Sequence, residues 1–206
     1  MTTNSAFWDR IAPRYARSRI SDQASYDRKL AVTREHLAPE MDVLEFGCGT
    51  GSTAILHAPF VRQITAIDIS GRMLDIARTK AADAGIENLS FRQDGIESFE
   101  ADGRRWDVVM GHSILHLLAD RQATFNKVHS LLRPGGRFIT STPCLSGPMS
   151  WLKPVLPVAR GFGLVPEVAF FTPATLEQEI SAAGFNIEHR WQPGRTKALF
   201  LIAVKD

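Results

Sequence analysis

The residues with the clearest chemical meaning form a glycine-rich loop at 45–51, with the sequence EFGCGTG. Its first two residues end a predicted short buried strand at 43–46, and a helical pattern follows it at 52–57. Glycine lets the backbone turn sharply and approach a ligand closely, because no side chain intervenes. The N-terminus of the following helix adds unpaired N–H groups and positive potential. The pattern predicts a ligand-holding loop, and a tight turn without a ligand is the plainer alternative.

The spacing of the glycines separates this loop from two other nucleotide-binding loops. The glycines are Gly47, Gly49 and Gly51, whereas a dinucleotide fingerprint would place its third glycine at the position of Ser52. A phosphate-binding P-loop would end in Gly-Lys-Ser or Gly-Lys-Thr, and no lysine lies near. The spacing therefore disfavours a nicotinamide dinucleotide and a nucleoside triphosphate.

Carboxylates follow the next two predicted strands. Asp68 lies near the end of the strand at 64–69, where ribose hydroxyls are held in doubly wound sheets, and Asp94 follows the strand at 89–92. Ligands of such sheets bind outside the carboxyl ends of the strands. Three successive strand ends therefore predict one ligand site.

These residues require a particular arrangement of strands and helices. Predicted strands at 43–46, 64–69, 89–92, 106–110 and 137–140 alternate with helices at 52–57, between Ser70 and Gly85, and at 120–132. Such alternation predicts right-handed crossovers and a parallel sheet between two layers of helices. A turn at 134–136 is expected before the fifth strand. Two further helices precede the sheet: one is capped by Ser5 and kinked or ended by Pro13, and the other covers about 25–37.

The end of the chain departs from this alternation. Thr172 and Pro173 are typical of a helix start, and Gly184 of a helix stop. Two strands at 186–191 and 198–204 follow, joined by a turn at 193–194. So short a connection permits only an antiparallel pair. The sheet is therefore expected to be mostly parallel, with one reversed strand near an edge.

The segment at 143–171 is long for a connection and holds five prolines and many apolar residues. It is expected to be a lid packed onto its own core. A hydrophobic wall for a lipophilic or aromatic ligand is a second interpretation. A peripheral membrane contact is a third, because Lys153 and Arg160 interrupt an apolar pattern.

Composition excludes several classes of protein. The 206 residues are 44% hydrophobic and 22% charged, which argues against a disordered or fibrous chain. A net charge of +2 is too small to indicate a nucleic acid partner. Basic residues are concentrated at 1–34, where they are expected to form a solvated helix face, and binding of an anionic partner or lipid surface is the alternative. The two cysteines, the absence of a secretory signal and the absence of a long apolar run predict a cytoplasmic protein.

Five motifs in order resemble those of class I S-adenosylmethionine-dependent methyltransferases: VLEFGCGTG, AIDIS, DGIESF, WDVVMGHSILHLL and LLRPGGRF. The similarity is closest to the small-molecule group that includes the ubiquinone and menaquinone biosynthesis methyltransferases. It covers about 40–142, and the opening FWDRIAPRYA also resembles the first helix of that group. The resemblance implies a Rossmann-like three-layer α/β sandwich with seven strands, S-adenosylmethionine as cofactor and S-adenosylhomocysteine as product.

The resemblance also implies roles for single residues. The methionine part of the cofactor would be lined by Glu45, Gly47, Cys48, Gly49 and Gly51. Asp68 would accept hydrogen bonds from the ribose hydroxyls. The adenine would lie near Ile69 and Met73, with its amino group at Asp94 beside the backbone of Gly95 and Ile96. His112 and Ser113 would flank the sulfonium, and Tyr15 would close the site.

Methyl transfer mainly requires alignment of the acceptor and exclusion of water. A general base helps where the acceptor keeps its proton at neutral pH, and His116 and His112 are the candidates for this base. A packing role for His116 is the alternative interpretation. The chain has no cluster with metal-ligand spacing, so no metal is expected. The Asn/Asp-Pro-Pro-Tyr/Phe motif of DNA and protein enzymes that methylate amino groups is absent after the fourth strand, which weakens a DNA or glutamine substrate. No nucleic acid partner is expected.

The expected function is methyl transfer to a small, lipophilic or aromatic acceptor. A methyltransferase acting on protein or RNA, and a non-catalytic module that binds S-adenosylmethionine, are the alternatives. The expected organisation is one domain over 1–206, with a helical cap at 1–40, a cofactor-binding core at 41–142, an insert or lid at 143–172, and a closing helix and hairpin at 173–206. The sequence gives no indication of the oligomeric state.

Overall fold

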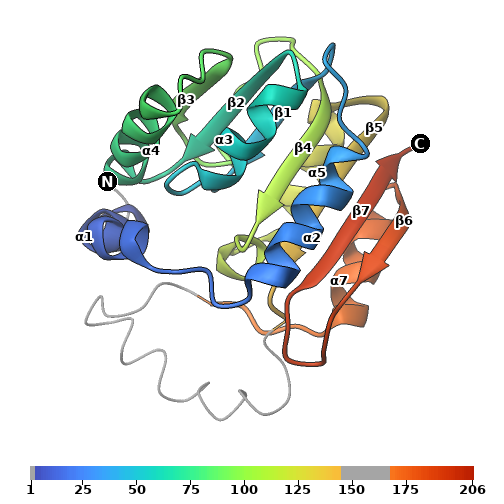
Figure 1. Ribbon diagram of the computed structural model, residues 1–206. Helices are drawn as coiled ribbons and strands as arrows, with labels where there is room; N and C mark the ends of the chain where they lie inside the picture. Colours follow the sequence, from blue (N-terminus) through green and yellow to red (C-terminus); the bar gives the residue numbers. More distant parts are fainter. Residues whose placement is uncertain (1–2, 145–167) are drawn as a thin grey trace.

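The computed structural model describes residues 3–144 and 168–206, which form a seven-stranded sheet with flanking helices (Figure 1). The strand order is β3-β2-β1-β4-β5-β7-β6. Strands β1 to β5 are parallel, and β7 is antiparallel to both of its neighbours, β5 and β6. The strands are β1 Asp42–Phe46, β2 Gln63–Asp68, β3 Leu89–Gln93, β4 Trp106–His112, β5 Leu132–Thr142, β6 Phe185–Trp191 and β7 Leu199–Lys205. The predicted mostly parallel sheet with one reversed strand near an edge is confirmed.

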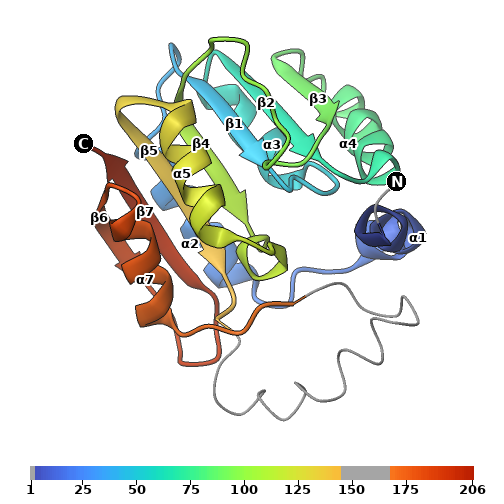
Figure 2. The same cartoon turned by 180° about the vertical axis from the view of Figure 1, so that it is seen from behind.

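The helices form a layer on each face of the sheet. One layer holds α2 Gln23–Arg34, α3 Ser52–His57 and α4 Gly71–Asp83, and the other holds α5 Arg121–Leu131 and α7 Pro173–Ala182 (Figure 2). Short 3₁₀ helices lie at η1 Ala58–Phe60 and η2 Leu115–Leu117. Because both faces of β1 are covered, all five of its residues are buried. The three-layer Rossmann-like sandwich is confirmed.

Several helix ends lie where their capping residues predict them. Ser70 accepts a hydrogen bond from the N–H of Met73 at 3.1 Å, and Thr172 accepts one from the N–H of Thr175 at 3.0 Å. Gly85 and Gly184 follow α4 and α7 with φ of 65° and 88°, a left-handed conformation that glycine adopts without a steric cost.

The first helix differs from its prediction. Helix α1, Thr3–Arg17, continues through Pro13, and Ser5 lies inside it rather than at its cap. Proline removes one backbone N–H donor but leaves the hydrogen bonds of the turns on either side. The helix is also held from outside, because Asp9 bonds to α4 and Ala12 is fully buried. These tertiary contacts explain why the proline does not end it.

Two other boundaries also differ. Helix α2 begins at Gln23, because the Asp22 side chain caps it by accepting from the N–H of Ser25, and it ends at Arg34 rather than near 37. Strand β5 begins at Leu132 and includes the expected turn at 134–136. The β4–β5 register shifts at this point, so the glycines form an irregularity within the strand rather than a loop before it.

The predicted insert at 143–171 lies mostly outside the described residues, so its expected roles as a lid, an apolar wall or a membrane contact stay predictions, as does the division of the chain into one domain with four parts. At the described end of the insert, Phe171 is buried and the Arg121 guanidinium lies 4.2 Å from the centre of its ring. Within 3–144 and 168–206, no helix has the length and hydropathy that crossing a bilayer requires.

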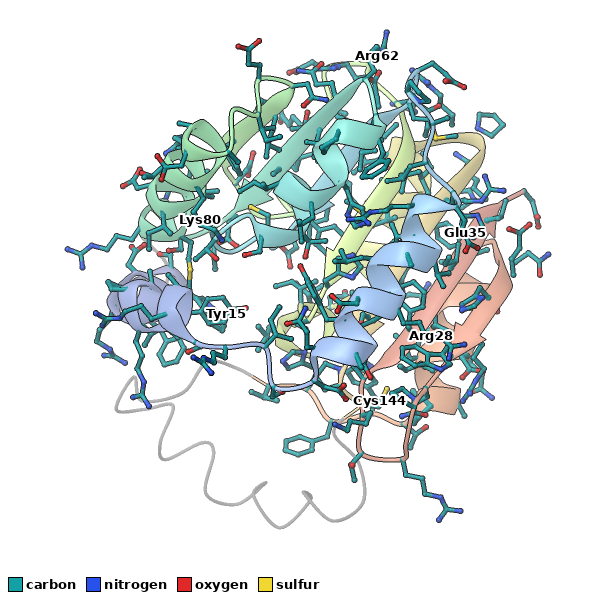
Figure 3. All side chains as sticks on the ribbon, in the orientation of Figure 1. Tyr15, Arg28, Glu35, Arg62, Lys80 and Cys144 are labelled. Carbon is teal, nitrogen blue, oxygen red and sulfur yellow. The ribbon has the colours of Figure 1, made fainter. Side chains whose placement is uncertain are left out.

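The carboxyl ends of β1, β2, β3 and β4 share one edge of the sheet. Helix α1 lies beside this edge (Figure 1), joined to the start of α4. In Figure 3, Tyr15 lies on the side of α1 that faces the sheet, whereas Arg62 lies at the opposite end of the strands. This edge therefore carries the candidate site.

Candidate functional site

The glycine loop between β1 and α3 lies in a backbone conformation that only glycine adopts readily. Gly47, Gly49 and Gly51 have φ of 64°, 54° and 71°. At Gly47 a Cβ atom would lie 2.7 Å from Cγ1 of Ile114, closer than such atoms can approach. The sequence therefore specifies both the turn and the packing of the residues after β4 against it.

Asp68, at the end of β2, ties this loop to the next helix. Its Oδ2 accepts from the N–H of Gly49 at 2.8 Å, and its Oδ1 accepts from the N–H of Ser70 at 2.9 Å. Each carboxylate oxygen can accept a further hydrogen bond. Burial raises the pKa of Asp68, while the two backbone donors oppose that shift. The carboxylate thus positions the loop and retains acceptor capacity toward the cavity that it lines.

A cavity of about 650 Å³ lies along this edge. That volume lies within the range of small-molecule sites. It brings together eleven of the predicted cofactor residues: Tyr15, Gly47, Gly49, Asp68, Ile69, Met73, Asp94, Gly95, Ile96, His112 and Ser113. Its further lining residues are Ser5, Trp8, Phe46, Gln93, Glu97, Ser98, Ile114, Leu117 and Leu118.

Beside the end of β3, the first cavity combines a carboxylate with apolar side chains. Asp94 accepts from the N–H of Gly95 at 2.9 Å and from the Ser98 hydroxyl at 2.7 Å, and it pairs with Arg92 at 2.8 Å. Ile96 and Met73 are almost fully buried beside it. This end can cover a flat apolar ring and accept a hydrogen bond at its edge.

A second cavity of about 520 Å³ opens on the other side of the loop. It contains Glu45 and Cys48, two of the three predicted residues of the loop that the first cavity lacks. Both cavities are lined by Tyr15, Gly47, Gly49, His112 and Ser113. The two cavities therefore meet between the glycine loop and the end of β4.

Glu45 carries an unsatisfied carboxyl group. Its side chain is 2% exposed, and Oε2 has no hydrogen-bond partner among the described residues. Burial, with a smaller contribution from the charge of Asp68, raises the pKa of Glu45 to about 8. A buried carboxyl without a partner is costly, and a cationic ligand group beside it would satisfy it. An α-ammonium group, as in a bound methionine, has the required charge.

His112, the last residue of β4, presents a neutral imidazole where the cavities meet. Its Nε2 is buried and lacks a hydrogen-bond partner among the described residues. Burial is the largest cause that lowers the pKa of His112 to about 3, followed by the charges of His57 and Lys29. The adjacent Ser113 has a φ of 53° and donates its N–H to the Ser141 carbonyl at 2.7 Å. The imidazole can therefore accept a hydrogen bond at neutral pH.

Two predicted residues lie outside both cavities. His116 lies in η2, and burial lowers its pKa to about 4. Gly51 lies at the start of α3, where a Cβ atom would come within 2.9 Å of the Ala77 Cβ. The close approach of α3 to α4 therefore accounts for this glycine.

The sequence interpretation missed residues that complete the site. Asp9 on α1 accepts from the Ser70 hydroxyl at 2.6 Å and from the N–H of Arg72 at 3.1 Å, which holds α1 and its Tyr15 over the first cavity. Lys29 of α2 and Ser141 of β5 line the second cavity. These contacts join positions distant in the sequence, and no local pattern indicates them. Among the described residues, no group of three or more His, Cys, Asp or Glu side chains is arranged to hold a metal ion.

Comparisons with known proteins agree with this geometry. A methyltransferase domain family matches residues 37–179. The chain is 30% identical over 141 residues to the highly reducing polyketide synthase 40 of Fusarium mangiferae, covering 65% of this chain and 6% of that protein. It is 28% identical over 147 residues to the ubiquinone biosynthesis O-methyltransferase of Methylobacterium sp. (strain 4-46), covering 66% of this chain and 57% of that protein. The chain thus spans only part of the length of these relatives.

A solved structure is also similar over nearly the whole chain. The complex of DhpI with SAH (S-adenosylhomocysteine) superposes with a TM-score of 0.76 at 20% sequence identity, and the match covers 98% of this chain and 94% of that one. The family match alone covers more than half of the chain. The chain therefore belongs to the methyltransferase domain family and carries an S-adenosylmethionine-dependent methyltransferase domain.

Proposed function

We propose that this protein transfers the methyl group of S-adenosylmethionine to a small, lipophilic or aromatic acceptor. The observation that carries the proposal is the meeting of two cavities at the glycine loop and His112. The first cavity holds the strand-end residues expected around a nucleoside, and the second adjoins it at the end of β4. Such an arrangement lets a cofactor and an acceptor meet at one point, which is the main requirement of methyl transfer.

The residues present fit the cofactor. Asp68 offers acceptor oxygens to the ribose hydroxyls, and Asp94 offers one to the adenine amino group beside the backbone of residues 95–96. Ile69 and Met73 cover the ring, and the backbone of the loop adjoins the methionine chain. We assign the α-ammonium group to Glu45, because the Oε2 atom of Glu45 lacks a hydrogen-bond partner among the described residues.

S-adenosylmethionine supplies, when bound, an electrophilic methyl group on a sulfonium. The protein contributes alignment, exclusion of water and acceptance of a proton. We assign the role of proton acceptor to His112, whose imidazole is neutral at neutral pH and which lines both cavities. This assignment reverses the expected order of the two histidines, because His116 lies outside both cavities.

The second cavity supports a small acceptor with an apolar part. Its volume of about 520 Å³ suits a small molecule, and its walls include Ile20, Leu30 and Trp191. One relative is a ubiquinone biosynthesis O-methyltransferase and another is a polyketide synthase, names that agree with such an acceptor. We place the reaction in the cytoplasm, in keeping with the free thiols of Cys48 and Cys144.

Transfer of labelled methyl groups tests this proposal. The protein is incubated with methyl-labelled S-adenosylmethionine and fractionated cell extract, with the Asp68→Ala variant as a control for cofactor binding. We expect label in small molecules that partition into organic solvent. Label found only in protein or RNA would instead support a methyltransferase that acts on a macromolecule. Binding of the cofactor without transfer to any fraction would assign the non-catalytic alternative.

A further inference from the structure

Helix α1 presents a row of arginines to solvent. It lies outside both layers of helices (Figures 1 and 2), so one of its faces is free. Arg10, Arg14 and Arg17 are exposed and recur at i, i+4 and i+7, a spacing that places them on one face of a helix. Ala12 is fully buried and lies two residues after Arg10, which is about 200° around the helix axis. These three arginines, the arginine face, therefore lie opposite the side of α1 that packs on the protein.

The protein itself does not neutralise the arginine face. Among the described residues, neither Arg14 nor Arg17 makes an ion pair with a carboxylate. The nearby acids are engaged elsewhere, because Asp9 bonds to the start of α4 and Asp22 pairs with Lys197 at 2.8 Å. Both arginines also lie outside the two cavities, so they are not needed to hold the cofactor. Their charges are therefore available to a partner outside the chain.

Large apolar side chains are exposed at the same end of the molecule. Tyr15 is 48% exposed, and Ile20, just after the helix, is 46% exposed, which makes them the two most exposed large hydrophobic side chains of the described residues. Arg19 adds an exposed cation beside Ile20. Tyr15 and Ile20 also line the second cavity, so this cavity opens at the end of α1. Cations combined with exposed apolar side chains are typical of helices that lie on a membrane surface.

We infer that α1 docks on an anionic lipid surface through the arginine face, with Ile20 reaching the apolar part of the interface. Guanidinium groups pair well with lipid phosphates, and a row of three arginines extends over about 10 Å of helix, which suits a flat surface. RNA would match the charge, but an exposed isoleucine contributes to burial in lipid rather than to stacking on bases. The inference goes beyond the proposed function and does not depend on it. It would place the opening of the second cavity beside the bilayer, where a lipophilic acceptor dissolves.

Binding to vesicles tests the inference. The full-length protein, without cofactor or acceptor, is sedimented with vesicles of phosphatidylcholine alone and of phosphatidylcholine mixed with phosphatidylglycerol. We expect binding only to the mixed vesicles, and added salt should weaken it. Arg14→Gln combined with Arg17→Gln should weaken this binding about tenfold to thirtyfold, because each arginine near an anionic surface contributes about fivefold. The control of equal charge is Arg104→Gln combined with Arg105→Gln, which changes two exposed arginines before β4, at the opposite end of the strands, and should bind as the wild type does.

Four results would overturn the inference. The wild-type protein fails to bind the mixed vesicles at low salt, the variant of Arg14 and Arg17 binds them as tightly as the wild type, or the control variant loses as much binding. In the fourth, polyglutamate or polyuridylate binds the wild-type protein more tightly than the vesicles do and depends on the same two arginines, which would assign the face to an acidic protein or to RNA. The affinity of the Arg14 and Arg17 variant for S-adenosylhomocysteine should equal that of the wild type. Failure of the proposed function is seen separately, as absence of methyl transfer by the wild-type protein.

Discussion

The two cavities lie side by side but are built in different ways. The first is built mainly from residues at the ends of β1, β2, β3 and β4, where backbone conformation and short-range hydrogen bonds fix the lining. The second draws side chains from α2, α3, β5 and the β6–β7 turn, which are far apart in the chain. The lining of the first cavity comes mostly from short segments of consecutive residues. The lining of the second cavity comes together only when distant parts of the chain fold against one another.

Substitution of Gly47 should have the largest effect on cofactor affinity, because it changes the backbone of the loop that lines both cavities. Gly47→Val places a branched side chain at φ +64° and within contact of Ile114. Left-handed strain of about 1–2 kcal/mol, together with overpacking of about 1–3 kcal/mol, predicts a loss of about a hundredfold or more in affinity for S-adenosylmethionine. Isothermal titration calorimetry measures this loss.

Gly103→Val is the matched control for strain alone. Gly103 has a φ of +79°, but nothing lies within 4 Å of the position of a Cβ atom. It should lower the unfolding temperature with little change in cofactor affinity. Equal losses of affinity in both variants would show that loop packing does not distinguish Gly47, and that the contrast between the cavities is misplaced.

Substitutions of His112 and His116 test which of the two histidines acts as the general base. His112→Asn should lower kcat by about a hundredfold, the lower part of the range for general base catalysis, with little change in cofactor affinity. His116→Asn should leave kcat nearly unchanged, since His116 lines neither cavity. Steady-state rates with the identified acceptor measure both. The reverse order of effects would restore His116 as the base.

Two carboxylates sharpen the description of the first cavity. Asp68→Ala should weaken S-adenosylmethionine about tenfold to a hundredfold, because a partner of two hydroxyls and a tie to the loop are both removed. Asp94→Ala should cost less, because Asp94 is already engaged by Arg92 and Ser98. Asp75→Ala, on the exposed face of α4, is the control and should cost nothing. Calorimetric affinities in the reverse order would contradict these assignments.

What the sequence predicts well is what its local signals determine. The strand ends, the glycine loop and the caps at Ser70 and Thr172 depend on short segments, so their positions follow from residue types. Pro13 shows where local signals fail, because tertiary contacts preserve a helix that the sequence pattern breaks. The Lys29–Ser141 contact joins positions more than a hundred residues apart, and no spacing rule predicts it. Local signals thus specify most of the lining of the first cavity, and long-range packing specifies most of the lining of the second.

Glu45 lies in β1 and lines the second cavity, and the effects expected there depend on pH. Its pKa in the folded protein, about 8, lies above the ordinary value of 4.5. An acid with a raised folded pKa contributes stability that is complete below the ordinary pKa and is lost as the pH rises through the folded pKa. Between these two values, stability of the wild-type protein should therefore fall relative to Glu45→Gln as the pH rises. Urea unfolding of both proteins across this window measures the difference and cancels the contribution of the buried histidines.

Cofactor binding should show the opposite dependence on pH. If the ionised carboxylate of Glu45 holds the ammonium group, binding requires loss of the Glu45 proton. A free pKa of about 8 then predicts affinity roughly fivefold weaker at about pH 7 than at about pH 8. It also predicts proton release, detectable by calorimetry in buffers of different ionisation enthalpy. Glu45→Gln should bind more weakly but without this dependence. Equal proton release by both proteins would place the ammonium group elsewhere and leave Glu45 a buried acid of the β1 core.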